Sequence, residues 1–421
     1  MTLESAMSGP EIITLGCRLN IADSEGIRQQ LGDVDDLVIV NSCAVTGEAV
    51  RQTRQAIRRA HRRRPDARIV VTGCAAQTDP AMFAAMPEVA RVIGNAEKPH
   101  FSAVLATAES VQVGDIMTVT EQAPQLLTAF ADRVRAFIAV QNGCDHRCTF
   151  CIIPFGRGPS RSVPAGAVVD QVRRLVEEGV QEVVLTGVDV TSYGPDLPGA
   201  QTLGALVESI LVGVPALPRL RLSSLDGIEI DERLFDLIVS EPRLMPHVHL
   251  SLQAGDDMIL KRMKRRHSRA QAVALVDRLH ARRPEIAIGA DIIAGFPTEA
   301  EAMFENSLVL VRDCAIVHGH VFPYSQRAGT PAARMPQIDP AIIRERAARL
   351  RSACAEERAR WLTSLVGSTQ QVLIETSGLA GHGASFAPVR FASPRPVGTV
   401  VSARIAGVED GALTAQETTH V

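Results

Sequence analysis

Three cysteines stand close together in the stretch GCDHRCTFC, which runs from residue 143 to residue 151. Cys144, Cys148 and Cys151 can supply thiolates, the donors that bind zinc and iron–sulfur clusters. A structural zinc site and an ordinary iron–sulfur cluster both need four protein ligands, so the fourth is missing here. Three thiolates can hold a cube of four irons and leave one iron open to a substrate. The alternative is a zinc site completed by another residue such as His146, which lies too close in sequence to reach around the same metal easily.

Three further cysteines each close a short apolar run. Cys17, Cys43 and Cys74 end the stretches EIITLGC, LVIVNSC and RIVVTGC. Continuous apolar runs separated by helical patterns predict buried parallel strands. The carboxyl ends of parallel strands form the edge of a sheet where ligands bind. We therefore expect these thiols to share a ligand, the alternative being three buried structural cysteines.

The rest of the pattern predicts the elements that position both triads. After a linker expected at 111–131, strands alternate with helices, as in most of a (β/α) barrel. A long helical pattern over 340–365 follows, and short alternating strands from residue 367 onward predict a small antiparallel β-barrel. The expected barrel strands are 135–144, 182–187, 219–224, 247–253, 286–295 and 318–325.

Composition narrows the class of protein. A chain of 421 residues is too long for a single hydrophobic core, so more than one domain is expected. The net charge of −3 does not indicate a class of binding partner. We expect no membrane association, because no apolar run approaches the roughly 18–20 residues that span a bilayer. The first residues do not resemble a secretory signal, so the eight cysteines are expected to be reduced, in the cytoplasm. Arginines crowd over 51–68 and basic residues over 261–269, and both stretches could contact RNA.

The motifs resemble those of a known family. CxxxCxxC with Phe150 before its last cysteine resembles the signature of radical S-adenosylmethionine (SAM) enzymes. TLGCRLNIADSE, VVTGCAAQ, LTGVDVTSYG and HVHLSLQAGDDMILKRMKRRHS resemble segments of the methylthiotransferases, and the tail resembles their TRAM domain. The expected fold class is therefore α/β: a flavodoxin-like parallel domain at 9–112, a partial TIM-like (β/α)6 radical SAM barrel at 130–360 and a TRAM-like RNA-binding barrel at 363–421.

This resemblance implies two [4Fe–4S] clusters and SAM as cofactors. Cys144, Cys148 and Cys151 would hold the catalytic cluster, whose open iron binds SAM. Cys17, Cys43 and Cys74 would hold an auxiliary cluster that carries the sulfur to be inserted. The implied SAM pocket lies at the strand ends of the barrel and contains Phe150, Gly187, Asp189, Ser223, Ser224 and Gln253.

The resemblance also implies a tRNA substrate and a reductant such as flavodoxin or ferredoxin. Arg18, Leu19 and Asn20 after the first cysteine are most similar to the clade that acts on N6-threonylcarbamoyladenosine beside the anticodon. That substrate carries a carboxylate, for which Arg157 and Arg161 are candidate partners. The alternatives are isopentenyladenosine in tRNA, an aspartate of a ribosomal protein, a radical SAM enzyme with only the barrel cluster, or a non-catalytic metal-containing RNA-binding protein.

Overall fold

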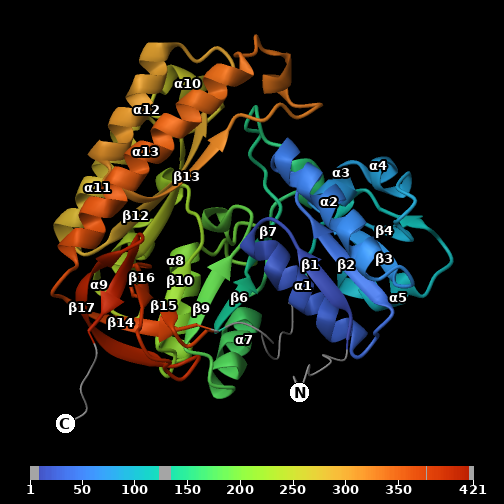
Figure 1. The fold of residues 1–421 in the computed structure, drawn as a ribbon, viewed down its shortest axis with the longest axis horizontal. Coiled ribbons are helices and arrows are strands. Elements are labelled where there is room, and N and C mark those ends of the chain that lie inside the picture. The colour runs from blue at the N-terminus through green and yellow to red at the C-terminus, as the bar shows by residue number, and fades with distance from the viewer. Residues whose placement is uncertain (1–8, 123–133, 376, 417–421) are drawn as a thin grey trace.

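The structure is a computed structural model that describes residues 9–122, 134–375 and 377–416. Figure 1 shows a parallel α/β layer at the amino-terminal end, a central array of strands flanked by helices, and a small β-barrel beneath that array. The prediction of a linker at 111–131 is wrong for the first residues of this stretch. Residues Val111–Gln112 form a strand, and Ile116–Thr118 form a 3-10 turn whose Ile116 is buried. The part of that stretch from residue 123 to residue 131 lies outside the described residues.

The amino-terminal layer is a five-stranded parallel sheet whose strand order follows the chain. The apolar side chains alternate along β2 and β3, so both faces of the sheet are covered. Val38 and Val40 face α2 and α3, whereas Leu37 and Ile39 face α1 and α5. The strands are β1 (Glu11–Thr14), β2 (Leu37–Ser42), β3 (Arg68–Gly73), β4 (Arg91–Ile93) and β5 (Val111–Gln112), and the helices are α1 (Arg18–Leu31), α2 (Gly47–Arg63), α3 (Cys74–Thr78), α4 (Pro80–Ala84) and α5 (Phe101–Leu105).

The central part contains the six parallel strands that the sequence predicted. They form two three-stranded sheets joined by backbone bridges from Leu220 to Leu244 and from Leu225 to Leu250. The result is an open barrel whose edge strands are β6 and β13. Its strands are β6 (Arg135–Ala139), β9 (Glu182–Thr186), β10 (Arg219–Leu222), β11 (His247–Gln253), β12 (Ala287–Ala294) and β13 (Ile316–Pro323). Its main helices are α7 (Ala165–Glu177), α8 (Leu203–Gly213), α9 (Glu232–Ser240), α11 (Arg269–Arg282), α12 (Glu301–Asp313) and α13 (Pro340–Ser364).

The last strands close into the small barrel that the sequence predicted. Its order is β14-β15-β16-β18-β17, and all pairs are antiparallel except β16 with β18. An apolar core that includes Val372, Val389 and Leu413 fills it. The strands are β14 (Thr369–Ile374), β15 (Ala380–His382), β16 (Pro388–Arg390), β17 (Val400–Glu409) and β18 (Ala412–Ala415). No helix in the described ranges is long and apolar enough to cross a membrane.

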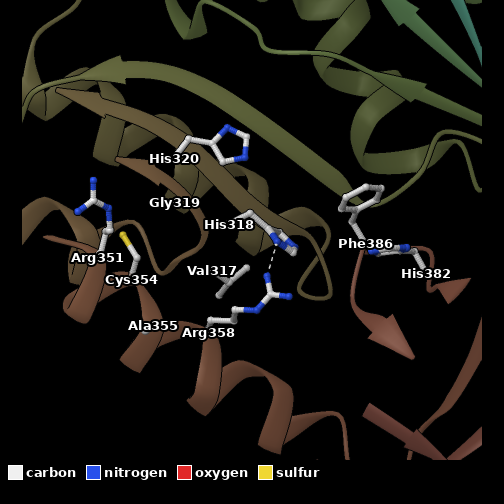
Figure 2. Close-up of a pocket in the computed structure, with 10 residues that line it drawn as sticks. All are labelled: Val317, His318, Gly319, His320, Arg351, Cys354, Ala355, Arg358, His382 and Phe386. Carbon is white, nitrogen blue, oxygen red and sulfur yellow. Dashed lines mark hydrogen bonds between the residues drawn. The ribbon is translucent and has the colours of Figure 1, made fainter. Parts of the chain in front are cut away.

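The turn between β15 and β16 docks the small barrel on the amino ends of the central strands. Phe386 in this turn stacks on His382, with ring centroids 4.5 Å apart, and its ring lies under the guanidinium groups of Arg135 and Arg221. Figure 2 shows Phe386 beside His318, which also contacts Arg358 of α13. The amino end of the barrel lumen is therefore closed by a residue from the carboxyl-terminal part of the chain.

A buried carboxylate lies at the same end of the lumen. Glu182, the first residue of β9, contacts Arg135 at 2.6 Å, Arg219 at 2.9 Å and Arg221 at 3.1 Å. Burial alone would raise the pKa of Glu182, but the three guanidinium groups lower it to about 2. The amino end of the lumen is thus lined by paired charges rather than by the apolar layers common in closed barrels.

Candidate active site

The central cysteine triad lies in the connection between two short strands, β7 (Gln141–Asn142) and β8 (Arg161–Ser162). The chain turns into this loop at Gly143, where φ is +73° and a Cβ atom would overlap the carbonyl oxygen of Pro159. The backbone N–H of Cys144 donates to Gly158 at 3.0 Å, which closes the base of the loop. Glycine is therefore required at position 143 for the loop to present its cysteines.

The far side of the loop is fixed to the segment after β11. The hydroxyl of Thr149 donates to the carbonyl of Arg262 at 2.8 Å, and its backbone N–H donates to Met263 at 3.1 Å. Arg265 places a guanidinium nitrogen 3.7 Å from the sulfur of Cys148. Burial raises the pKa of Cys151 to about 12, so a metal that binds this thiol must displace its proton.

The residues predicted for the SAM pocket all lie at carboxyl ends of barrel strands or beside the cysteine loop. Gly187 and Asp189 follow β9, Ser223 and Ser224 follow β10, and Gln253 ends β11 at a β-bulge. Phe150 packs edge-on against Phe296, with ring centroids 6.5 Å apart. Asp189 lies 3.6 Å from the sulfur of Cys144, and a Cβ atom on Gly187 would meet the side chain of Gln141. The structure thus brings this set to one end of the barrel.

A polar network beside Cys144 was not predicted as a unit. His146 contacts Asp189 at 2.9 Å and Glu229 at 3.5 Å, and the Ser192 hydroxyl lies 3.0 Å from each of the same two carboxylates. Hydrogen bonds to these carboxylates raise the pKa of His146 to about 10. Arg266 contacts Glu229 from the other side at 2.8 Å. The sequence signal was Asp-Gly-Ile-Glu after the Ser-Ser pair, but the spacing alone did not show that Glu229 faces His146.

The three amino-terminal cysteines lie as predicted at the ends of three neighbouring strands. Cys17 is the N-cap of α1 after β1, Cys43 follows β2, and Cys74 begins α3 after β3. A Cβ atom on Gly16 would lie 2.9 Å from the sulfur of Cys43, which shows how closely the first two loops approach. Burial, with a smaller contribution from Cys74 and Cys17, raises the pKa of Cys43 to about 12.

Arg157 joins the two triads. It ends α6 (Ile153–Arg157), the helix that follows Cys151, and its Nε lies 3.2 Å from the sulfur of Cys74. The same guanidinium, 2% exposed, contacts Asp23 at 2.8 Å. Lys98 also contacts Asp23, at 2.7 Å. Two buried cations therefore share one carboxylate, which leaves positive charge beside the sulfurs.

These surroundings fit iron–sulfur clusters at both triads. Thiolate is the metal-binding form of cysteine, and a guanidinium beside the sulfur compensates its negative charge. Arg157 does this at Cys74 and Arg265 at Cys148. All six cysteines are free thiols, so none is consumed by a disulfide. The cysteines whose sulfurs contact these arginines belong to different triads, so each triad has its own cationic partner.

The comparisons with known proteins agree with this arrangement. The radical SAM superfamily matches residues 138–311, and the uncharacterized protein family UPF0004 matches residues 10–94. The chain is 50% identical to threonylcarbamoyladenosine tRNA methylthiotransferase MtaB of Rickettsia prowazekii over 95% of this chain and 96% of that protein. The MtaB protein of Aquifex aeolicus is 36% identical over 86% of this chain and 91% of its own. The chain belongs to the MtaB-type methylthiotransferase family.

Two further similarities extend beyond the MtaB proteins. The tRNA-2-methylthio-N(6)-dimethylallyladenosine synthase of Maricaulis maris is 34% identical over 89% of both chains. The radical SAM methyltransferase TsrM of Kitasatospora setae, solved with cobalamin and a [4Fe–4S] cluster, has a TM-score of 0.50. It is 16% identical and is matched over 75% of this chain and 68% of its own. At that identity the likeness to TsrM concerns the fold alone.

The structure corrects the expectation that Arg157 or Arg161 meets a substrate carboxylate in this MtaB-type chain. Arg157 is committed to Asp23 and Cys74. Arg161 is 3% exposed and donates to the backbone carbonyls of Pro159 at 2.8 Å and Arg157 at 3.1 Å. Both arginines support the loop that carries the cysteines and leave no free face for a substrate.

The two basic stretches of the MtaB-type chain differ in how many of their basic side chains form no ion pair. In the stretch 261–269, Arg265 and Arg266 pair with Asp226 and Arg269 pairs with Asp313. Lys261 and Lys264 of this stretch are exposed and form no ion pair with a described residue. On α2, three exposed arginines form no ion pair within the described residues. These are Arg54, Arg59 and Arg62. Helix α2 is amphipathic, with Thr53, Ala56, Ile57 and Ala60 buried, and it is the more open of the two basic surfaces.

Proposed function

We propose that this enzyme inserts a methylthio group at carbon 2 of N6-threonylcarbamoyladenosine next to the anticodon of tRNA. The observation that supports this most directly is the 50% identity to an MtaB protein over nearly the full length of both chains. The geometry agrees, because α6, which follows Cys151 of one triad, packs against α3, which begins at Cys74 of the other. Gly156 of α6 packs so closely on Cys74 of α3 that a Cβ atom there would lie 3.1 Å from the Cys74 Cβ.

In this proposal each triad holds one [4Fe–4S] cluster. Cys144, Cys148 and Cys151 would bind the cluster that cleaves SAM, and Cys17, Cys43 and Cys74 would bind the cluster that supplies sulfur. When bound, the first cluster and SAM together supply a radical able to abstract hydrogen from an unactivated carbon. The SAM pocket would consist of Phe150, Gly187, Asp189, Ser223, Ser224 and Gln253.

The side chains around the barrel triad would position SAM and exclude water. The backbone of Gly187 passes too close to Gln141 to accept a side chain, so glycine is required where the chain leaves β9 for the pocket. Asp189 is held by His146 and Ser192 and presents a carboxylate beside Cys144. A carboxylate there would suit the methionyl ammonium group of SAM. Arg265 and Arg266 close the opposite side through Asp226 and Glu229.

The partners of the enzyme and the boundaries of its domains belong to the same proposal. tRNA bearing threonylcarbamoyladenosine would be the substrate, and a flavodoxin or ferredoxin would supply the electron, in the cytoplasm. The amino-terminal domain would occupy 9–112, the radical SAM domain 130–360 and the RNA-binding TRAM-like domain 363–421.

The proposal is tested by nucleoside mass spectrometry of two tRNA substrates. Anaerobically reconstituted enzyme is supplied with SAM, dithionite and tRNA bearing either threonylcarbamoyladenosine or isopentenyladenosine. We expect methylthio product on the first substrate and little on the second. Product on isopentenyladenosine alone would assign the enzyme to the other substrate class.

A pair of serine variants distinguishes the roles of the two triads. Cys43→Ser should lose about half of the iron, because one of two four-iron clusters is lost, and should still cleave SAM without forming methylthio product. Cys148→Ser should also lose about half of the iron but should not cleave SAM. Full iron and full product from Cys43→Ser would show that the amino-terminal triad holds no cluster.

A further inference from the structure

The barrel is open along one side, where the amino-terminal layer meets it. Strand order leaves β6 as one edge of the barrel and β13 as the other. Helix α1 packs on β6, with Leu19 and Ala22 against Ala139. Arg18, the residue before Leu19 and the first of α1, therefore lies at this open side.

Arg18 lies beside the charged lumen and has no partner among the described residues. It is half-buried, and within the described part of the chain its guanidinium forms neither a hydrogen bond nor an ion pair. Arg135, Arg221, Glu182 and Asp291 all lie within electrostatic range of Arg18. A half-buried cation without a counter-ion is costly unless a ligand supplies one.

The acidic groups in the lumen and at its amino end are already engaged. Glu182 contacts three arginines, and Glu375 contacts Arg135 and His382. Asp291 of β12 contacts His249 at 3.1 Å and His320 at 3.3 Å. These three carboxylates stand against four guanidinium groups, those of Arg18, Arg135, Arg219 and Arg221. One further carboxylate, supplied by a ligand, would therefore balance the fourth guanidinium group.

The other edge of the opening is also polar and accessible. His320 lies on the edge strand β13 with its side chain 60% exposed, and its ring centroid is 4.6 Å from that of His249. Beside this edge a cavity of about 370 Å³ lies between β13, α13 and the small barrel, where His318, Arg358 and Phe386 line it (Figure 2). A ligand that enters between β6 and β13 would meet Arg18 on one side and His320 on the other.

We propose that Arg18 binds the carboxylate of the threonylcarbamoyl group and so selects the substrate. This inference rests on the proposed function. A guanidinium can donate two parallel hydrogen bonds to a carboxylate, a geometry that an uncharged substituent on the same adenosine does not reproduce. Arg18 contacts the substituent and not the reacting carbon, so it is a specificity residue for the reaction.

The test compares two synthetic anticodon stem-loops that differ at one group. One carries N6-threonylcarbamoyladenosine and the other carries its carboxamide, which has the same shape without the charge. For the wild-type enzyme we expect kcat/KM to be on the order of 10- to 100-fold higher for the acid, as for a charged hydrogen bond in a partly buried site. Arg18→Gln should bring this ratio close to one, and Arg18→Lys should restore part of it because the charge remains.

Arg28→Gln is the matched control, because Arg28 lies on the same helix and pairs with Glu25 rather than facing the lumen. It should keep the wild-type ratio. Iron content of each variant, measured in parallel, reports whether the fold and the neighbouring Cys17 site are intact. Equal rates of the wild-type enzyme on acid and amide, or an unchanged ratio in Arg18→Gln with normal iron, would overturn the inference. Failure of the wild-type enzyme on both stem-loops would instead contradict the proposed function.

Discussion

Arg157 links the helix that follows the barrel triad to Cys74 of the amino-terminal triad. Its guanidinium lies between Asp23 and Cys74, both buried, although it belongs to the helix that follows Cys151. A buried ion pair adds little net stability when formed, but removal of one partner leaves the other charge unpaired. A change at Arg157 is therefore expected to disturb the amino-terminal triad from the other half of the molecule.

We predict that Arg157→Gln lowers the stability of the enzyme by about 3–5 kcal/mol, because Asp23 loses one of its two cationic partners. Iron content should fall toward half, since Cys74 also loses its cationic neighbour. Thermal unfolding and iron analysis of anaerobically purified protein check both effects. The control is Arg173→Gln, which removes an exposed pair with Asp170 and should cost less than about 1 kcal/mol. A normal iron content in Arg157→Gln would show that this guanidinium does not support the triad.

Glu182 provides a pH-dependent prediction. Its pKa is lowered to about 2 by three arginines, so its contribution to stability is complete above its ordinary pKa of 4.5 and is lost as the pH falls toward 2. Glu182→Gln should cost about 3–5 kcal/mol at neutral pH, because the arginines are left uncompensated. The difference between wild type and variant in urea unfolding should shrink steadily below about pH 4. A difference that is constant with pH would refute this role of the carboxylate.

At the level of elements, α2 presents a basic face whose charges are partly free. Thr53, Ala56, Ile57 and Ala60 are buried against the sheet, which leaves the arginines on the outer side. Salt-sensitive binding to the tRNA backbone is the expected use of such a face.

We predict that the triple change of Arg54, Arg59 and Arg62 to Gln weakens tRNA binding. The slope of log affinity against log salt should fall by about one for each phosphate that α2 no longer neutralises. Filter binding over a range of salt concentrations measures both quantities. The matched control replaces Arg174, Arg282 and Arg312, which are exposed on α7, α11 and α12. Equal effects of both triple variants would mean that net charge alone, and not α2, determines affinity.

The sequence predicted the strands, the long helix and the strand-end cysteines because each depends on a local pattern. Cys17, Cys43 and Cys74 follow apolar runs, and a parallel sheet brings such ends together whatever the strand order. Contacts between distant segments left no local pattern. Arg157 meets Cys74 across 83 positions of the chain, and Phe386 reaches Arg135 from another barrel. The assignment of Arg157 and Arg161 to the substrate failed for this reason, since the sequence shows an arginine but not its partner.

At the level of the whole molecule, the small carboxyl-terminal barrel is part of the central fold as well as an appended unit. Phe386 lies against His247, His318 and two arginines at the amino end of the lumen. Arg219 donates to the carbonyl of Gly383 in the same turn at 3.2 Å. The proposed RNA-binding domain thus also completes the wall of the proposed catalytic chamber.

We predict that Phe386→Ala destabilises the docking of the two barrels by about 2–3 kcal/mol, since it removes aromatic packing and two cation–π interactions. Hydrogen exchange should increase at the amino ends of β6, β10 and β11. Phe391→Ala is the control, because Phe391 packs in the core of the small barrel and not against the lumen. Protection at those strand ends that is the same in Phe386→Ala as in wild type would show that the turn does not seal the lumen.

The position of Phe386 in the chain has a consequence for synthesis. A ribosome makes the first barrel strand about a hundred residues after it begins the α/β layer, yet the residue that closes the lumen emerges some 250 residues later still. All six proposed cluster ligands are translated long before that point. A nascent chain therefore has all six cysteines available while the amino end of its lumen is still open, and that end closes only when the last barrel folds. The order of the polypeptide thus separates the synthesis of the proposed cluster ligands from the closure of the lumen in time.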